Sequence, residues 1–287
     1  MTDIQPLTIE TGPALVDLDV IRQRLLNDAK GYGGDVFEEV AVFLRDDNGA
    51  IIGGAYGELG WDWLYVDLLW VAESVKGRGD GRRVLGAIEQ YALQQGVNRV
   101  HLATTSFQAL GFYHHVGYRL FGVVEDRPPG YLFYFLRKSI TPQVITPPLD
   151  VVTAPKTDDV RAISRGLSGH NRRQGVRGKG ERLVVIVRQN NNTIIGGLIG
   201  VTYWGWLDLQ HVWVDEAWRG RNYGARMLTM AEQEARRRGC TDVFTDVPEF
   251  CEVSFFEKRG YQTFTTLEDR PSGYRTHFMR KALLTRI

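Results

Sequence analysis

The chain has 287 residues, of which 43% are hydrophobic and 24% are charged, and its formal net charge is +1. This composition predicts a globular protein with one or two apolar cores, and the near-zero charge argues against nucleic acid as the main partner. Cys240 and Cys251 are the only cysteines, and no paired CxxC or HExxH spacing occurs, so we expect neither a disulfide framework nor a metal site. The N-terminus lacks the features of a signal peptide, and no run of residues is apolar enough to cross a membrane, so we expect a cytoplasmic protein.

The predicted elements of the first half alternate between strands and helices. Strands are expected at 5–11, 38–45, 51–59, 63–71, 99–104, 118–125 and 131–137. Helices are expected at 14–29 and 107–116, and a third follows the glycine-rich segment 76–81 and ends at Gly96. This order predicts an α+β domain, a mixed and mostly antiparallel sheet flanked by helices.

The second half of the chain repeats the first. GVVEDRPPGYLFYFLRK at 122–138 is matched by TTLEDRPSGYRTHFMRK at 265–281, and the two halves align without a gap from residue 51 to residue 138. The join at 139–149 carries three prolines, which favour an extended connection. We therefore expect two tandem domains of the same fold, at 1–140 and 147–287.

The glycine-rich segment has the composition of an anion site. A helix start exposes unpaired backbone N–H groups and the positive end of the helix dipole, and glycines allow a phosphate to approach that backbone closely. Lys76, Arg78, Arg82 and Arg83 add positive charge around it. A structural turn is the alternative interpretation, while the patterns of a P-loop and of the dinucleotide-binding fingerprint are both missing.

Two motifs together resemble the GNAT family of N-acetyltransferases. In the first copy they are Lys76-x-x-Gly79-x-Gly81 and Phe112-Tyr113-x-x-x-Gly117-Tyr118. In the second copy they are Arg219-x-x-Asn222-x-Gly224 and Phe255-Phe256-x-x-x-Gly260-Tyr261. The EDRPxGYxxxFxRK tail and the Trp-x-Trp pattern are similar to a bacterial subgroup of that family.

The resemblance implies where acetyl-coenzyme A (acetyl-CoA), as a substrate, would bind. The sheet would splay after the central strand, and the pantetheine arm would meet main chain near Leu69 and Val71, or near Val212 and Val214. The pyrophosphate would lie on the loop, formed in the first copy by Lys76, Gly77, Arg78, Gly79, Gly81 and Arg82. In the second copy the loop consists of Arg219, Gly220, Arg221, Asn222, Gly224 and Ala225.

The resemblance also implies a chemistry that the two copies carry unequally. Asp67 would be the general base that relays the proton of the acceptor amine, and Tyr113 the general acid that protonates the departing thiolate. The second copy has Gln210 and Phe256 at these positions, so catalysis is expected in the first copy. In the first copy, Asp80 would place negative charge beside the pyrophosphate unless Arg78 or Arg82 pairs with it.

Charge differs between the copies near the expected acceptor groove. The second copy is basic between Arg161 and Arg188, whereas the matching stretch of the first copy is rich in aspartate and glutamate. One hypothesis is that the first groove accepts a cationic amine and the second holds an anionic group, and the alternative is a solvated loop.

The leading functional hypothesis is acetyl transfer from acetyl-CoA to a small-molecule primary amine by a monomer or homodimer. A second hypothesis is a non-catalytic CoA-binding sensor or scaffold whose basic second domain docks a protein or RNA. A third places the chemistry in the second copy, with Asp208 and His211.

Overall fold

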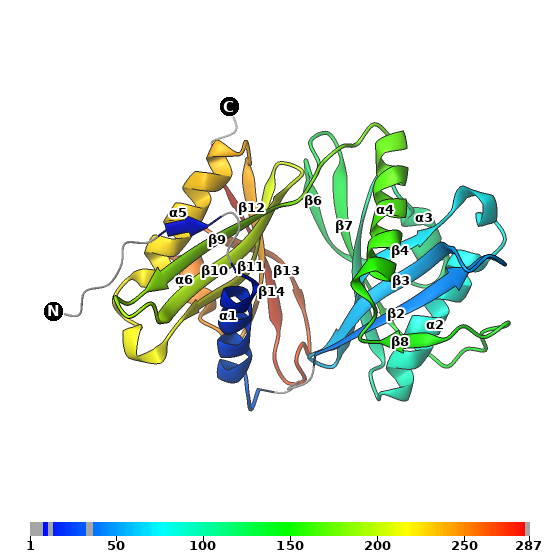
Figure 1. The fold of residues 1–287 in the computed structure, drawn as a ribbon, viewed down its shortest axis with the longest axis horizontal. Helices are drawn as coiled ribbons and strands as arrows, with labels where there is room; N and C mark the ends of the chain where they lie inside the picture. The colour runs from blue at the N-terminus through cyan, green and yellow to red at the C-terminus, as the bar shows by residue number, and fades with distance from the viewer. Residues whose placement is uncertain (1–7, 11–13, 33–36, 285–287) are drawn as a thin grey trace. The chain divides into compact units, whose positions relative to one another are not determined.

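The computed structural model describes residues 8–10, 14–32 and 37–284, which form two seven-stranded sheets (Figure 1). The sequence predicted each of these sheets as mixed and mostly antiparallel, flanked by helices, and this is confirmed. In each sheet a single pair of neighbouring strands is parallel, β4 with β5 in one and β11 with β12 in the other.

The first sheet has the strand order β6-β7-β5-β4-β3-β2-β8. Its strands are β2 (Glu38–Arg45), β3 (Ile51–Gly60), β4 (Trp63–Val71), β5 (Arg99–Thr105), β6 (Arg119–Glu125), β7 (Leu132–Ser139) and β8 (Val151–Thr153). The helices beside it are η1 (Glu73–Val75), α2 (Asp80–Gln94), α3 (Leu110–His115) and α4 (Thr157–Arg173). Apolar residues of α2, including Val84, Leu85 and Ile88, face the sheet in one core.

The second sheet repeats this arrangement in the order β1-β9-β10-β11-β12-β14-β13. Its strands are β1 (Thr8–Glu10), β9 (Glu181–Arg188), β10 (Ile194–Tyr203), β11 (Trp206–Val214), β12 (Asp242–Pro248), β13 (Gln262–Leu267) and β14 (Thr276–Ala282). The helices beside it are α1 (Leu15–Asp28), η2 (Glu216–Trp218), α5 (Tyr223–Arg237) and α6 (Val253–Glu257).

The two repeats exchange their first strand and helix. Strand β1 of the first repeat pairs antiparallel with β9 of the second, and β8 of the second repeat pairs antiparallel with β2 of the first. The helices follow their strands, so that α1 packs on β10 and β11 while α4 packs on β3 and β4 (Figure 1). Each sheet is therefore completed by a segment from the other repeat.

Because of this exchange, the compact units of the structure do not consist of the same residues as the sequence repeats. The first-repeat unit comprises the described residues of Gly33–Arg177 together with Glu268–Tyr274. The second-repeat unit comprises those of Met1–Tyr32, Gly178–Leu267 and Arg275–Ile287. The contiguous boundaries 1–140 and 147–287 follow the repeats, and they do not coincide with these units, because segment pairing and not chain order decides which residues pack together.

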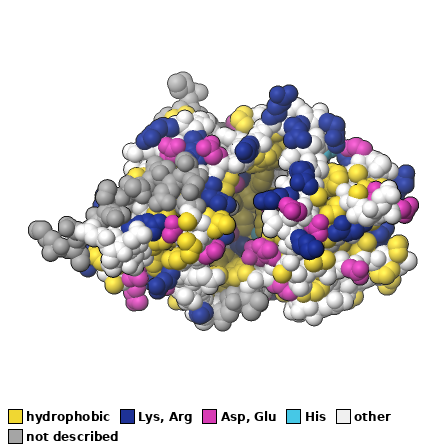
Figure 2. Space-filling view, viewed as in Figure 1, with side chains coloured by type: hydrophobic (Ala, Val, Ile, Leu, Met, Phe, Trp, Pro, Cys, Tyr) yellow, Lys and Arg dark blue, Asp and Glu magenta, His cyan; other side chains and the backbone are white. Residues whose placement is uncertain are grey.

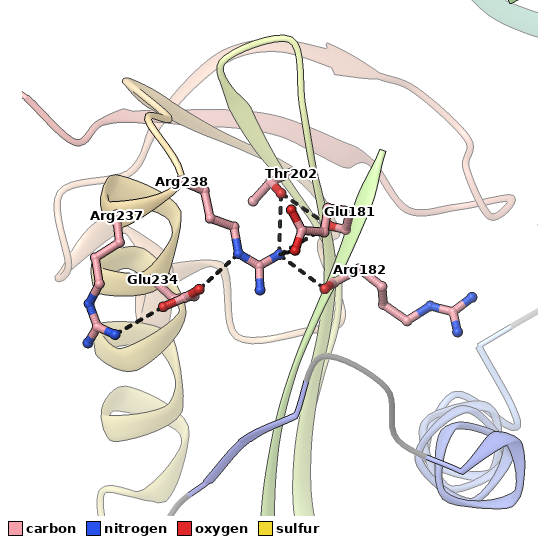
Figure 3. A network of polar contacts seen from close by, with 6 residues as sticks. All are labelled: Glu181, Arg182, Thr202, Glu234, Arg237 and Arg238. Carbon is pink, nitrogen blue, oxygen red and sulfur yellow. Dashed lines mark hydrogen bonds and ion pairs between the residues drawn. The ribbon is translucent and has the colours of Figure 1, made fainter. Parts of the chain in front are cut away.

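Helix α5 is tied to the strands of its sheet by Arg238, which follows its last turn (Figure 3). The Nε of Arg238 donates to Glu234 at 2.9 Å, and its Nη1 donates to the carbonyl oxygen of Arg182 at 3.1 Å. In the first-repeat unit the same connection uses a different pair, because the hydroxyl of Tyr91 on α2 donates to Glu38 on β2 at 2.9 Å. In both units these hydrogen bonds tie the helix that follows the glycine-rich loop to a strand of the sheet.

A buried glutamate links the long helix to the far strands in both units. Glu89 on α2 is 1% exposed, accepts a hydrogen bond from the Tyr118 hydroxyl at 2.7 Å and pairs with Lys138 at 2.7 Å. In the second-repeat unit Glu232 has the same partners in Tyr261 and Lys281. A buried carboxylate is tolerated when its charge is paired and its oxygens accept hydrogen bonds.

Replacement of this glutamate should destabilise the fold. We expect Glu89→Ala to lower the free energy of unfolding by about 3 kcal/mol, because it leaves the Tyr118 hydroxyl and the Lys138 ammonium without their partner. Glu89→Gln keeps an acceptor for Tyr118 and should cost less. Urea unfolding followed by circular dichroism measures both variants, and equal stabilities for Glu89→Ala and the native chain would contradict this account.

Candidate functional site

The central strand β4 carries a β-bulge at Asp67. Its pairing with β3 runs from Leu68 opposite Tyr56 directly to Val66 opposite Gly57, which leaves Asp67 without an opposite residue. Pairing of β4 with β5 consists of Leu64, Tyr65 and Val66 and goes no further, although β5 continues in register with β7 to its end. A bulge bends its strand and redirects side chains, so the sheet splays from Asp67 onward.

The glycine-rich loop lies at the end of this splayed half of β4. The short helix η1 follows the strand, and Gly77 and Gly79 then adopt φ of +77° and +89° before α2 begins at Asp80. A Cβ at either glycine would meet no atom within 4 Å, so conformation rather than crowding requires glycine there. The backbone N–H groups of the first turn of α2 are thus presented at an open surface.

Asp80 is paired, although not with the residues expected. Its carboxylate bonds the Arg83 guanidinium at 2.8 Å, with both side chains largely buried. The expected partners were Arg78 and Arg82. The correction follows from helix geometry, because Asp80 and Arg83 are three residues apart on α2 and project from the same face.

Helix α3 brings the aromatic motif against the start of α2. The Phe112 ring lies 3.7 Å from where a Cβ of Gly81 would be, and Phe112 contacts Tyr113 edge to face with 5.2 Å between ring centres. Tyr113 is buried against Tyr118, at 5.6 Å. Burial raises the pKa of the Tyr113 phenol above its ordinary value, so the group stays protonated at neutral pH.

The Asp67 side chain is exposed. The Tyr65 hydroxyl approaches one of its oxygens at 3.5 Å. Burial, together with the carboxylates of Glu39, Asp67 and Glu58, raises the pKa of nearby Tyr56. Three acidic side chains therefore surround one tyrosine on this face of the sheet.

The second repeat reproduces this backbone with different side chains. Gln210 is skipped in the pairing of β10 with β11, as Asp67 is in the first repeat. Gly220 and Asn222 have φ of +73° and +65°, so the asparagine adopts the left-handed conformation of Gly79. Phe256 takes the place of Tyr113, with 5.1 Å to Phe255 and 5.4 Å to Tyr261 between ring centres.

A cavity of about 320 Å³ lies beside the first turns of α5 and is lined by Asn222, Ala225, Arg226, Thr229 and Met230. Two of these residues, Asn222 and Ala225, belong to the set that the sequence assigned to the coenzyme. Nearby, the Nε of Arg219 donates to the carbonyl oxygen of Val214 at 3.1 Å, and its guanidinium also pairs with Asp28 of α1.

Comparison with known proteins gives two matched regions. The sequence model of the acetyltransferase (GNAT) family matches residues 20–118 and 158–261. The chain belongs to the GNAT acetyltransferase family. The two matched regions and the two sheets make it a tandem member, and enzymes of this family use acetyl-CoA.

Two relatives each match less than half of the chain. Blasticidin-S acetyltransferase of Streptomyces morookaense is 38% identical over 138 residues, which are 48% of this chain and 96% of that protein. An acetyltransferase of Agrobacterium fabrum is 34% identical over 99 residues, which are 34% of this chain and 72% of that protein. Among solved structures, an acetyltransferase from Bacillus cereus is 27% identical, with a TM-score of 0.41, over 46% of this chain and 96% of that one.

Within this acetyltransferase, the segment exchange changes the charges of the two grooves. Helix α4, with exposed Arg161, Arg165, Arg172 and Arg173, belongs to the first-repeat unit, and basic side chains gather over it in Figure 2. Asp28 lies in the second-repeat unit, while Glu38 and Glu39 stay in the first. The hypothesis of one acidic and one basic groove assigned α1 and α4 to their own repeats, whereas the exchange places each helix in the other unit. The charge that each groove favours in an acceptor stays a prediction.

No helix among the described residues is long and apolar enough to cross a membrane. No cluster of three or more His, Cys, Asp or Glu side chains in the same residues is arranged to hold a metal ion.

Sequence reasoning found the loop and the aromatic motif, but it missed three features of the site. The first is the bulge, which has no local signature in the residues around Asp67. The second is the set of carboxylates around Tyr56, which come from three consecutive strands and meet through strand pairing. The third is the exchange of α1 and α4.

The left-handed loop residue offers a test of the coenzyme site. Gly79→Ala should weaken acetyl-CoA binding roughly tenfold, because a non-glycine residue at this φ costs about 1–2 kcal/mol and will displace the loop. Gly79→Asn is the matched control, since asparagine holds this conformation at position 222, and it should bind more tightly than Gly79→Ala. The KM for acetyl-CoA measures the effect, and equal values for the two variants would contradict this reasoning.

Proposed function

We propose that the first repeat transfers the acetyl group of acetyl-CoA directly to a primary amine of a small molecule. The observation that carries this proposal is the bulge, which sets Asp67 where β4 parts from β5. Tyr113 follows β5, on the other side of the splay. In this proposal the Asp67 carboxylate and the protonated Tyr113 phenol flank the gap that would hold the thioester.

The coenzyme would extend from the splay to the start of α2. In this proposal its pantetheine arm follows Leu69 and Val71, and its pyrophosphate lies on the loop from Lys76 to Arg82. The open left-handed glycines, and the unpaired N–H groups of the helix start, support the anion site. In the second repeat, Val212, Val214 and the loop from Arg219 to Ala225 would form the matching site. There the bond from Arg219 occupies the Val214 carbonyl oxygen.

The chemistry is an acyl substitution at the thioester carbonyl. The amine nitrogen attacks the carbonyl carbon, Asp67 accepts a proton from that nitrogen directly or through a water molecule, and the carbon–sulfur bond breaks. The thiolate leaves toward Tyr113. In this proposal the Tyr113 phenol donates a hydrogen bond and then its proton to the leaving sulfur, and it regains a proton from solvent after the product leaves.

The acceptor is a cationic small molecule in this proposal. Glu39 and Glu58 lie opposite each other on β2 and β3, and Glu58 lies opposite Tyr65 on β4, next to the bulge. Carboxylates on this face attract an ammonium group toward Asp67. The relative that acts on blasticidin S supports a small-molecule amine, and that compound is the first acceptor to test.

The third hypothesis, with Asp208 and His211 as the catalytic groups, has less support. Burial and the neighbouring Arg22 lower the pKa of His211 to about 4. An imidazole with that pKa is neutral at pH 7 but is a weak base there. The second repeat also offers Phe256, which has no proton to donate.

Replacement of the two proposed catalytic groups tests the mechanism. Tyr113→Phe and Asp67→Asn should each lower kcat by roughly 10²-fold or more, the usual contribution of a general acid or base. Release of free thiol from acetyl-CoA with blasticidin S and a panel of amines measures the rate.

The second repeat supplies the matched controls. Phenylalanine already packs at position 256, with ring spacings close to those around Tyr113, so Tyr113→Phe should unfold at the temperature of the native chain. Phe256→Leu and Gln210→Ala alter the corresponding positions and should leave the rate within about twofold, since they supply no proton transfer. Full activity of the Asp67→Asn, Tyr113→Phe double variant would refute the assignment.

A further inference from the structure

Helix α4 comes from the second repeat, yet it spans the open end of the splay in the first-repeat unit. Near its middle, Gly166 packs so closely on the Trp70 ring of β4 that no Cβ would fit. Near its end, Asn171 accepts a hydrogen bond at 3.0 Å from Gln108, in the turn after β5. One helix therefore contacts both of the strands that part at Asp67, one directly and the other through this turn.

The hydrogen bond between Asn171 and Gln108 is buried and belongs to a small network at the end of β5. Asn171 is 6% exposed. The Oε1 of Gln108 accepts the backbone N–H of Thr105 at 3.2 Å and the hydroxyl of Thr104 at 3.3 Å, while its amide nitrogen donates to Asn171. The Asn171 oxygen thus orients the Gln108 amide, and that amide holds the last residues of β5.

Helix α4 also contacts the glycine-rich loop and the short helix η1 before it. The Nδ1 of His170 lies 3.4 Å from the Lys76 ammonium, and Arg173 bonds Glu73 at 3.3 Å. Burial and the nearby Lys76 lower the pKa of His170, so its ring is neutral and can accept a hydrogen bond from Lys76. These contacts are partly exposed and contribute little energy individually, but they set the position of α4 at the loop.

The second-repeat unit shows the reciprocal arrangement. Helix α1 packs Ile21 against Gly197, where a Cβ would not fit, and Asp28 pairs with Arg219 of the loop. Tyr32 stacks on Phe250, in the turn after β12, with 4.5 Å between ring centres. Each exchanged segment thus contacts the first basic residue of the glycine-rich loop in its unit, Lys76 or Arg219. It also contacts the turn that follows β5 or β12, the strand that separates from the central strand.

We propose that the second repeat supplies one wall of the first repeat's acyl-transfer site, with Asn171 as a positioning residue. Asn171 acts through Gln108, which holds the end of β5, the side of the splay that leads into the helix of Tyr113. The second repeat is then required for acetyl transfer in the first, although it lacks the carboxylate and the phenol. This inference rests on the proposed function of the first repeat.

The test uses the full chain with three variants. Asn171→Leu removes the acceptor oxygen at nearly constant size, and Asn171→Asp keeps an oxygen in the same place. Asp159→Asn is the control on the same helix, because Asp159 pairs with Arg45 at the exposed far end of α4. We expect Asn171→Leu to lower kcat at least tenfold with KM for acetyl-CoA within threefold, Asn171→Asp to recover most of the loss, and Asp159→Asn to match the native rate.

A fourth variant separates this arrangement from one in which each repeat keeps its own helix. Tyr32→Ala should leave first-repeat turnover within twofold, because Tyr32 contacts the second-repeat unit. A large loss in Tyr32→Ala with none in Asn171→Leu would overturn the proposal. So would equal losses in the two variants, or native kcat in Asn171→Leu.

Amide hydrogen exchange measures the contact without relying on activity. In Asn171→Leu, exchange at Thr105 should accelerate relative to the native chain, because the amide that accepts its N–H is no longer oriented. Asp159→Asn should show no such change. If the chain acetylates no amine but Thr105 responds, the proposed function fails while the contact stands. If Thr105 does not respond, the proposed positioning role is wrong whatever the activity.

Discussion

The premature end of pairing between β4 and β5 is the constraint on which the site depends. Two parallel strands that stay paired leave no room between them, because every backbone N–H and C=O group facing the partner is occupied. The bulge at Asp67 breaks the register at the point where the two strands part. One extra residue thus accounts for an opening in the sheet, backbone that faces the opening, and a carboxylate at its apex.

The exchange of the first strand and helix follows from the physics of a duplicated chain. Strands β2 and β9 occupy equivalent places in the two repeats, and each pairs with the first strand of the other repeat. In separate molecules such an exchange would produce a dimer, whereas within one chain it costs no association entropy. Each sheet would be complete with or without the exchange. The exchange changes which helix contacts the glycine-rich loop of each unit. Charge at the first repeat's groove is therefore set by residues that lie about a hundred positions away in sequence.

The features that could be predicted from the sequence are those that depend on residues close together in the chain. The strands from 38–45 to 131–137 and the start of α2 follow from local patterns, and the structure places them within a few residues of the expected positions. Asn222 stands where the first copy has Gly79, and asparagine is one of the few residues that tolerate the left-handed conformation found there. The exposure of Asp67 and the pairing of β1 with β9 could not be predicted, because both depend on register between strands distant in sequence. The pairing of Asp80 with Arg83 was missed for a simpler reason. The two residues are three apart on α2, so the helix places both side chains on the same face.

The second repeat keeps most of the backbone features of the first. It retains the bulge, both left-handed loop residues and the buried glutamate with its tyrosine and lysine. It differs at the two side chains that would handle protons, and both replacements are compatible with the backbone, because Gln210 still occupies the bulge and Phe256 still packs on Tyr261. If the second repeat served only as an independent domain, nothing would tie its geometry to catalysis elsewhere. Because the first helix of the second repeat lies against β4, a change that distorts α4 would also shift β4 beyond the bulge. Under the proposed function, this contact gives one segment of the second repeat a physical role in acetyl transfer by the first.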